Sequence, residues 1–291
     1  VGSNVLMTRT PDSHFLVEAR HRGTKVAVFS PDFSQTSKVG DEWFPIHQGQ
    51  DGAFWMAVNH VLLREYYIKK QVPYFMQYLQ RYSDAPFLVV LDRQANGSYR
   101  PGKLLRASQM PASTFEENAE WKTFVWDTKT DAPVIPPGTV GHRWQTKKGD
   151  WNLHAMNSQT GETIEPALFL PGTTTEITVS LDDFSEGSNV RQYTNAVPCR
   201  AVQTIDGEIL VTTAFELMLA QFNVNRNGDD RYEESTDLAF TPKWQEQFTG
   251  IDAANLVRFA KEWGHTAERT NGQVSVIIGA GVNHWYHNNL I

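Results

Sequence analysis

Helical and extended patterns alternate along the chain. Apolar residues recur every three or four positions in Ala53 to Tyr67, Pro73 to Tyr82 and Ala253 to Trp263, and this spacing predicts amphipathic helices. A short continuous apolar run, Val26 to Phe29, predicts a buried parallel strand, because parallel strands are covered on both faces. A similar run at Val274 to Ile278 predicts a second strand of this kind.

Proline residues mark where several helices begin. Thr10-Pro11-Asp12 places an N-cap threonine before a proline and an acid, and predicts a helix that ends near Arg22. Thr241-Pro242 repeats this pattern and predicts a short helix over Lys243 to Phe248. Helical spacing also covers Ala214 to Phe222.

The middle of the chain has a different pattern, in which short strand-forming runs alternate with turn residues. The predicted strands are Phe87 to Leu91, Trp121 to Trp126, Ile177 to Leu181 and Ile209 to Thr213. We therefore predict an α/β fold with a doubly wound, mostly parallel, nucleotide-binding-like sheet and helices on both of its faces. Residues 1–84 and 213–291 would form this domain, and residues 85–212 a β-rich, loop-heavy insertion.

The composition narrows the classes of partner. The 291 residues carry a net charge of −7, so the clustered positive charge that binds nucleic acid or anionic lipid is not expected. A single cysteine, Cys199, excludes an internal disulfide and a four-cysteine metal site. No apolar run approaches the roughly 20 residues of a membrane helix, so we expect no direct membrane insertion. Both ends have the pattern of interrupted strand and loop units, and we expect a fragment of a longer chain.

Candidate binding chemistry follows the first predicted strand. Ser30, Pro31 and Asp32 come directly after it, at the edge where open α/β sheets bind ligands. The Asp32 carboxylate can accept paired donors, from ribose hydroxyls or equally from a guanine edge. The alternative is that Pro-Asp is ordinary turn chemistry.

A second candidate segment precedes the first long helix and consists of Gln48, Gly49, Gln50 and Asp51. Free backbone N–H groups at a helix start favour a phosphate, and glycine permits its close approach. An ordinary N-cap at Asp51 is the alternative. Because this loop and Asp32 would share one edge of the sheet, the two together predict a nucleotide site.

Two further glycine motifs are weaker indications of nucleotide binding than the segments at Asp32 and Gln48 to Asp51. Gly97 to Lys103 has the spacing of a phosphate-binding loop, but Leu104 occupies the position of the magnesium-binding Ser or Thr. Asn96-Gly97 favours a hairpin turn there instead. Gly279, Ala280 and Gly281 follow the second predicted strand but lack the third glycine of a dinucleotide signature.

Histidine and tryptophan residues leave further alternatives. His284 and His287 can share a helix face and bind a metal, but they have no acid or thiol companion, and we favour a packed aromatic turn. The sequence contains no Gly-x-Ser-x-Gly, His-Glu-x-x-His or Cys-x-x-Cys, so hydrolase and zinc protease functions lack support. We expect four tryptophans of the insertion to anchor a small core: Trp121, Trp126, Trp144 and Trp151.

Several motifs together resemble the catalytic alpha subunits of membrane-bound respiratory nitrate reductases, in the dimethyl sulfoxide reductase superfamily of molybdenum enzymes. The resemblance covers nearly the whole chain. Its principal motifs are Gly2 to Asn4, Thr8 to Phe15, Ser30 to Phe33, Gln48 to Asp51, His60 to Glu65 and Gly279 to His287. Nitrite oxidoreductases share much of this layout.

The resemblance implies an oxidoreductase with a bis(molybdopterin guanine dinucleotide) molybdenum cofactor, which in the full-length subunit reduces nitrate to nitrite by oxygen atom transfer in anaerobic nitrate respiration. Asp32 would hold the guanine or ribose of one arm, and Gln48 to Asp51 its phosphates. Asn283, His284 and His287 would lie near the substrate funnel. The implied cofactor-binding residues are Gly2, Ser3, Asn4, Ser30, Pro31, Asp32, Gln48, Gly49, Gln50, Asp51, Gly279, Ala280, Gly281, Asn283 and His284.

The resemblance also implies an iron–sulfur beta subunit and a membrane quinol-oxidising subunit as partners, which would hold the protein on the cytoplasmic side of the cell membrane. The family's iron–sulfur segment and its molybdenum-ligating aspartate have no counterpart in this sequence. We therefore expect no catalytic residue or metal ligand in the fragment, and no activity from it alone. Gln50 also replaces the threonine of the family's usual Gln-Gly-Thr-Asp loop. A related enzyme such as nitrite oxidoreductase, or a non-redox nucleotide-binding module, stays open.

Overall fold

The computed structural model describes residues 1–138, 154–172, 175–182, 192–226, 232 and 234–284. The chain forms two compact units, which we call the first unit (Val1–Lys70 with Phe222–Ile291) and the second unit (Gln71–Gln221). Helices and strands occur in both, which confirms the predicted mixed α/β class. The boundaries predicted at residues 84 and 213 fall inside the second unit, because helices α5 (Pro73–Tyr82) and α6 (Ala214–Gln221) both belong to it.

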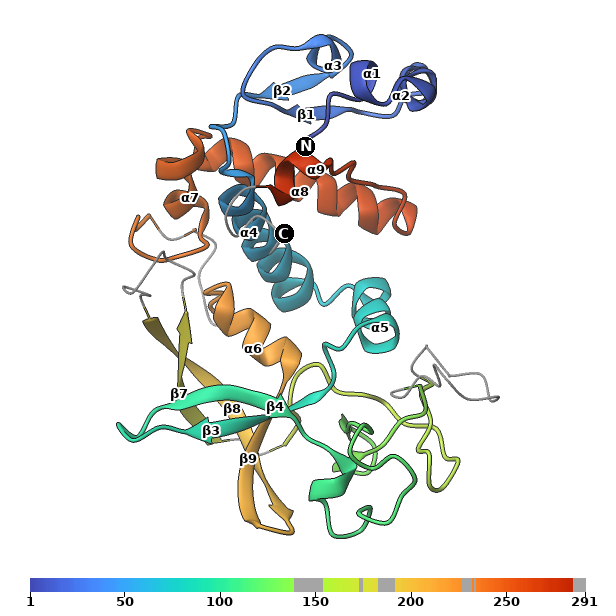
Figure 1. The fold of residues 1–291 in the computed structure, drawn as a ribbon, viewed down its shortest axis with the longest axis vertical. Coiled ribbons are helices and arrows are strands. Elements are labelled where there is room, and N and C mark those ends of the chain that lie inside the picture. Colours follow the sequence, from blue (N-terminus) through green and yellow to red (C-terminus); the bar gives the residue numbers. More distant parts are fainter. Residues whose placement is uncertain (139–153, 173–174, 183–191, 227–231, 233, 285–291) are drawn as a thin grey trace. The chain divides into compact units, whose positions relative to one another are not determined.

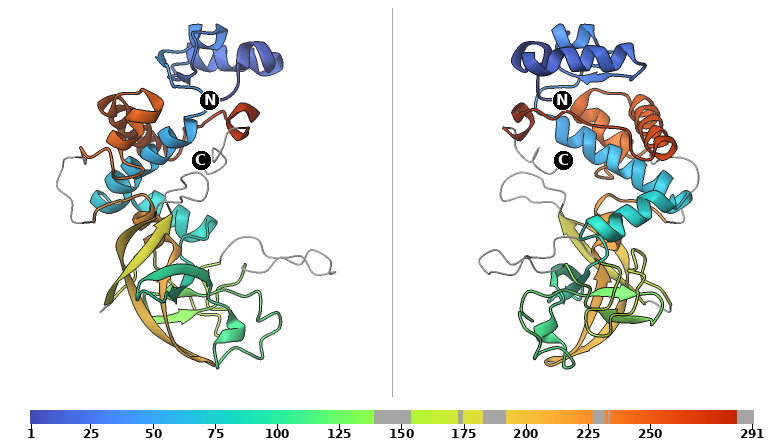
Figure 2. Two further views of the ribbon diagram at one scale, coloured as in Figure 1. Left: turned by 60° about the vertical axis from the view of Figure 1, so that its left-hand side comes forward. Right: turned by 90° about the vertical axis from the view of Figure 1, so that its right-hand side faces the viewer.

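The first unit is built around two short parallel strands, β1 (Ala27–Phe29) and β2 (Glu42–Phe44). Figures 1 and 2 show helices beneath these strands and further helices, from the first part of the chain, around their other side. The helices of this unit are α1 (Val5–Thr8), α2 (Thr10–His21), α3 (Gln35–Lys38), α4 (Asp51–Leu62), a π-helix (Leu63–Lys69), α7 (Pro242–Thr249), α8 (Ala253–Thr270) and α9 (Ala280–Asn283).

An aromatic cluster holds the two strands against α4 and α8. Phe29 and Phe44 are paired across the strands, and their rings stack with centroids 4.6 Å apart. Phe54 of α4 and Phe259 of α8 pack against both rings. Burying each of these side chains contributes roughly 1.5–3 kcal/mol, so this cluster accounts for the attachment of the strands to the helices.

The predicted strand Val274 to Ile278 is wrong. Among the described residues its backbone forms no strand ladder: the Val1 amino group donates to the Ile277 carbonyl at 3.1 Å, and the Val1 carbonyl accepts from Gly279 at 2.8 Å. One neighbouring residue cannot support a ladder, so an apolar run with strand propensity stays outside the sheet. In the described residues the parallel sheet of the first unit accordingly has two strands, fewer than the doubly wound sheet that we predicted.

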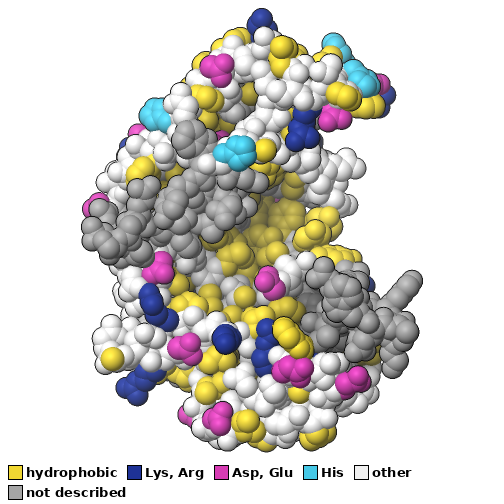
Figure 3. Space-filling view, in the orientation of Figure 1, with side chains coloured by type: hydrophobic (Ala, Val, Ile, Leu, Met, Phe, Trp, Pro, Cys, Tyr) yellow, Lys and Arg dark blue, Asp and Glu magenta, His cyan; other side chains and the backbone are white. Residues whose placement is uncertain are grey.

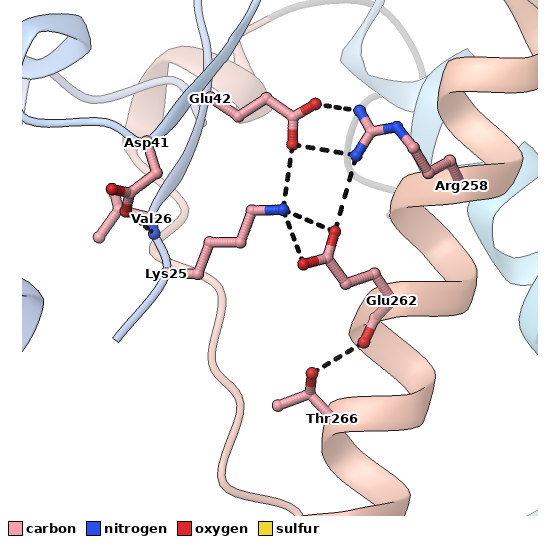
Figure 4. A network of polar contacts seen from close by, with 7 residues as sticks. All are labelled: Lys25, Val26, Asp41, Glu42, Arg258, Glu262 and Thr266. Carbon is pink, nitrogen blue, oxygen red and sulfur yellow. Dashed lines mark hydrogen bonds and ion pairs between the residues drawn. The ribbon is translucent and has the colours of Figure 1, made fainter. Parts of the chain in front are cut away.

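Four charged side chains connect the strands to α8, as Figure 4 shows. Lys25 lies 2.6 Å from Glu262 and 3.5 Å from Glu42. Arg258 pairs with the same two carboxylates and closes a ring of alternating charges. All four side chains are partly exposed, so the ring contributes less to stability than the aromatic cluster.

The second unit contains a closed barrel, which confirms the predicted β-rich middle. Its neighbouring strands are β3 (Leu88–Arg93), β4 (Tyr99–Leu104), β7 (Thr175–Asp182), β8 (Gln192–Thr204) and β9 (Gly207–Thr213). A separate pair, β5 (Val125–Asp127) and β6 (Ala132–Val134), and a 3₁₀ turn (Ala107–Gln109) accompany α5 and α6. We predicted parts of β3, β5, β7 and β9 but not β4, β6 or β8.

The hairpin preferred for Asn96-Gly97 is confirmed. β3 and β4 pair in antiparallel fashion around it, Gly97 has a φ of +85°, and Ser98 donates its backbone N–H to the Asn96 side chain. A phosphate-binding loop would need a following helix, whereas β4 follows.

The tryptophan predictions have mixed outcomes. Trp126 is 3% exposed and lies in a core cluster, as predicted, but Trp121 is 61% exposed and the prediction for it is wrong. Trp121 lies in a turn before β5 and its side chain is on the surface, although the nearby Ala119 is buried in this core. Trp144 and Trp151 lie outside the described residues.

Two helix starts test the capping pattern. Thr241 caps α7 as predicted, accepting a hydrogen bond from the Trp244 backbone at 3.3 Å. The N-cap prediction for Thr10 is wrong, because α1 ends immediately before Arg9 and Arg9 takes the capping position. No described helix is long and apolar enough to cross a bilayer.

Candidate functional site

Two of the predicted binding segments, far apart in sequence, cross each other closely. Gly2 lies against the segment that begins with Gly279, and the Val1 carbonyl accepts the Gly279 N–H at 2.8 Å. Gly279 then caps the short helix α9, and its backbone is buried. The first residues of the chain and the start of α9 are therefore held together.

This crossing requires residues without a Cβ atom. A Cβ on Gly279 would lie 2.1 Å from the Gly2 carbonyl oxygen, and one on Gly281 would lie 2.9 Å from the same atom. A Cβ on Gly2 would lie 2.5 Å from the Val282 side chain, and Gly2 also has a φ of +62°. Glycine at all three positions therefore allows the two segments to pack backbone against backbone.

The loop before α4 has the backbone expected of a phosphate-binding helix start. Gly49 has a φ of +73°, Gln50 occupies the N-cap position, and Asp51 is the first helical residue. The alternative that Asp51 is itself the N-cap is wrong. Gln48 is exposed and lies close to the amino-terminal, positive end of the α4 dipole.

Val1 connects the beginning of the chain to the core beneath this loop, because it packs against the hydrophobic cluster that contains Phe54 of α4. The Asp51 carboxyl at the start of α4 is buried, and this burial raises its pKa.

His47 fixes this loop to α7, and the sequence pattern gave no indication of it. Its Nδ1 lies 2.8 Å from the Phe248 carbonyl, and its backbone N–H donates to the Thr249 carbonyl at 3.0 Å. A carbonyl only accepts, so Nδ1 carries the proton. Gly250 provides the space, because a Cβ there would lie 2.7 Å from the imidazole.

Asn4 connects the beginning of the chain to the Asp32 loop through α3. Its side-chain oxygen accepts from the Thr36 hydroxyl at 2.6 Å, and the Thr36 hydroxyl accepts the Leu6 N–H at 3.2 Å. The Ser37 hydroxyl in turn donates to the Asp32 carbonyl at 3.5 Å. Thr36 is buried and was not among the predicted site residues, since a helical threonine carries no distinctive pattern.

Asp32 itself lies exposed beyond the end of β1. The Ser30 hydroxyl donates to its carboxylate at 3.1 Å and to its backbone carbonyl at 2.9 Å. The Trp43 indole N–H donates to the Ser30 carbonyl at 3.0 Å. The turn Ser30-Pro31-Asp32 is therefore internally fixed, with its acidic group toward solvent.

Other predicted residues are not brought into this arrangement. Among the described residues, no hydrogen bond joins Asp32 to Gln48, and no group of three His, Cys, Asp or Glu side chains could hold a metal ion. His284 is exposed, Asn283 ends α9, and His287 lies outside the described residues.

A cavity of about 910 Å³ in the first unit has residues next to the glycine crossing in its wall, namely Val1, Ser3 and Ile277. Its walls come from β1, α2, α8 and the segment 272–277, with Trp55, Phe259 and Trp263 among its apolar residues. Of the predicted site residues, only Ser3 lines it. The loops at Asp32 and Gln48 present exposed groups instead, and Figure 3 shows acidic and basic side chains interspersed over the visible face.

Loops that follow a parallel strand, as at Asp32, or precede a helix, as at Gln48, are typical ligand-binding positions of α/β proteins that bind a nucleotide-bearing cofactor. The chain belongs to the molybdopterin oxidoreductase family, whose model matches residues 1–291. Membership implies a molybdenum–pterin cofactor.

Three proteins of known name show which members of this family the chain is similar to. The nitrate reductase alpha chain of Bacillus subtilis (strain 168) is 43% identical over 293 residues, which cover 100% of this chain and 24% of the relative. The respiratory nitrate reductase 1 alpha chain of Escherichia coli (strain K12) is 37% identical over 302 residues, 98% of this chain and 24% of the relative. The perchlorate reductase subunit alpha of Dechloromonas aromatica (strain RCB) is 25% identical over 291 residues, 100% of this chain and 25% of the relative. This chain thus spans about a quarter of their length.

Proposed function

We propose that this chain is part of the molybdenum-containing catalytic subunit of a nitrate reductase, and that it holds one guanine dinucleotide arm of a bis(molybdopterin guanine dinucleotide) cofactor. The observation that carries the proposal is the glycine crossing. Gly2 and Gly279 are 277 positions apart, yet neither can carry a side chain without steric conflict with the other segment. Such an exclusion of Cβ atoms is expected where backbone amides contact a cofactor.

Each segment has a distinct part in holding the arm. Gly2, Ser3, Asn4 and the segment Gly279 to Gly281 would contact the pterin and adjoining phosphate through backbone amides other than that of Gly279, which donates to the Val1 carbonyl. The α4 start at Gln48 to Asp51 would hold the other phosphate with its helix dipole. Asp32 would accept the guanine or ribose donors.

The whole subunit would then reduce nitrate to nitrite, because the bound cofactor supplies a metal that can exchange an oxygen atom and two electrons with the substrate. His284, with Asn283 and His287, would lie near the substrate path. An iron–sulfur subunit and a membrane quinol-oxidising subunit would deliver the electrons and hold the protein at the cytoplasmic face of the membrane. The 291-residue chain alone would turn over no nitrate.

Cofactor analysis of the full-length subunit tests the proposal. The purified protein should contain molybdenum and release GMP on acid hydrolysis, and with a reduced dye it should consume nitrate. Asp32→Ala should lower the molybdenum and GMP content several-fold, whereas Asp206→Ala, an exposed turn acid of the second unit, should not. A protein that contains a pterin without GMP, or that oxidises nitrite but does not reduce nitrate, would contradict the assignment.

A further inference from the structure

An exposed pair of aromatic rings adjoins Asp32. Phe33 is 57% exposed and Trp43 is 36% exposed, and their ring centroids lie 5.3 Å apart at an interplanar angle of 82°. Single exposed aromatic residues are common on protein surfaces and need no explanation. Here two rings contact each other directly beside an acidic turn, at the strand edge where α/β proteins bind ligands.

The position of Trp43 follows from the strand that carries it. Phe44 points into the aromatic core, so Trp43, the preceding residue of β2, points to the opposite face of the sheet. Its indole N–H donates to the Ser30 carbonyl at 3.0 Å, which fixes the ring against the Ser30-Pro31-Asp32 turn. Phe33 directly follows Asp32 and packs on this fixed ring.

The carboxylate beside these rings retains accepting capacity. One Asp32 oxygen accepts from the Ser30 hydroxyl, and among the described residues no other hydrogen bond reaches that carboxylate. A guanine edge offers two parallel N–H donors that suit a carboxylate, whereas an adenine edge offers one donor beside an acceptor. Aromatic rings stack on any base, because every base has a π face.

We propose that Phe33 and Trp43 are the base-binding platform of this nucleotide site. A purine stacks on the face of one ring while the other ring, at 82° to the first, contacts the purine edge, and the Asp32 carboxylate selects guanine by accepting the N–H donors of that base. The inference rests on the proposed function and adds to it the residues that bind the base. Stacking and selection are separate here: the rings supply affinity for any purine, and the carboxylate supplies the preference.

Isothermal titration of the chain with GDP and ADP tests this division of roles. Phe33→Leu and Trp43→Leu should each weaken GDP binding about tenfold, and ADP binding by a similar factor. Asp32→Asn should weaken GDP binding by about the same factor while leaving ADP binding unchanged. Phe15→Leu is the matched control, since Phe15 is 61% exposed on α2 and outside the platform.

The outcomes separate this inference from the proposed function. If GDP binds and both ring variants bind it as tightly as Phe15→Leu does, the platform is refuted and the nucleotide site stands. If the unmodified chain binds neither GDP nor ADP, both the platform and the nucleotide site are refuted. Circular dichroism of each variant identifies any loss of binding that comes from unfolding, and for Trp43 the milder Trp43→Phe, which keeps a ring, should retain most of the affinity.

Discussion

The carbonyl oxygen of Gly2 lies so close to Gly279 that a Cβ atom added to Gly279 would be only 2.1 Å from it. Neither segment can move away freely, because the Val1 carbonyl accepts the Gly279 N–H and the Val1 amino group donates to Ile277. The proposed site is thus part of the fold of the first unit, and changes there affect stability as well as binding.

Substituting Gly279 should show this coupling. Gly279→Ala should lower the free energy of unfolding by about 1–3 kcal/mol, because the added methyl group forces two backbones apart. Gly281→Ala should cost less, since its Cβ would lie 2.9 Å from the same oxygen. Urea unfolding measures both, with the exposed Ser275→Ala as control. Equal stability of Gly279→Ala and the control would show that the two segments are not in contact.

A buried histidine should make the first unit sensitive to acid. His60 is 2% exposed, its Nδ1 lies 2.7 Å from the Phe222 carbonyl, and burial lowers the pKa of His60 to about 4. In the unfolded chain the pKa of His60 is near 6.5. Between pH 6.5 and 4, the unfolded chain therefore binds a proton at His60 that the folded chain does not bind. Stability should fall by about 3 kcal/mol as the pH drops from 7 to 4.

Variants isolate this contribution from other titrating groups. His60→Gln should remove most of the slope of unfolding free energy against pH between about 6.5 and 4, whereas His21→Gln, an exposed histidine of α2, should leave it unchanged. Urea unfolding at several pH values measures the slope. An unchanged slope in His60→Gln would mean that His60 is protonated in the folded chain.

A glycine within α8 should be required for packing. Alanine normally stabilises a helix interior by about 1 kcal/mol relative to glycine. At Gly264, however, a Cβ would lie 2.3 Å from the ring of Tyr66, whose hydroxyl is held at 2.7 Å from the Lys261 carbonyl. Gly264→Ala should therefore be destabilising by about 1–3 kcal/mol. A rise in the melting temperature would show that the ring moves aside without cost.

The ring of charges in Figure 4 should contribute modestly and depend on salt. Lys25 and Glu262 are 47% and 44% exposed, so Glu262→Gln should cost less than about 1 kcal/mol. The difference should shrink in 1 M salt, where the Debye length is about 3 Å. A double-mutant cycle with Lys25→Met gives the coupling energy. A coupling that does not change with salt would contradict a screened surface pair.

Local patterns predicted the positions of the longer helices, but not the short helices α1, α3 and α9 or the extension of α8 to Thr270. The bounds of α5 agree with the apolar spacing from Pro73 to Tyr82, and Thr241 caps α7, since both features depend on residues within one or two turns. β8 was missed because its 13 residues include Asn195 and Pro198, which are uncommon within strands. Its position in the barrel comes from pairing with β7 and β9.

The candidate site was predictable in its parts but not in its connections. The strand end at Asp32 and the helix start at Gln48 to Asp51 have local signatures. The crossing of Gly2 over Gly279, the link from Asn4 to Thr36 and the anchoring of His47 are long-range contacts. A local pattern carries no information about which distant segment lies beside it, so these contacts required the three-dimensional structure.

Hydrogen–deuterium exchange of the chain with and without GDP tests the central claim most directly, because that claim requires four separate segments to hold one nucleotide arm. GDP should slow the exchange of backbone amides in Gly2 to Asn4, Ser30 to Asp32, Gln48 to Asp51 and Gly279 to Gly281 together, while the barrel strands of the second unit exchange as before. Protection confined to other parts of the chain, or none at saturating GDP, would contradict the account.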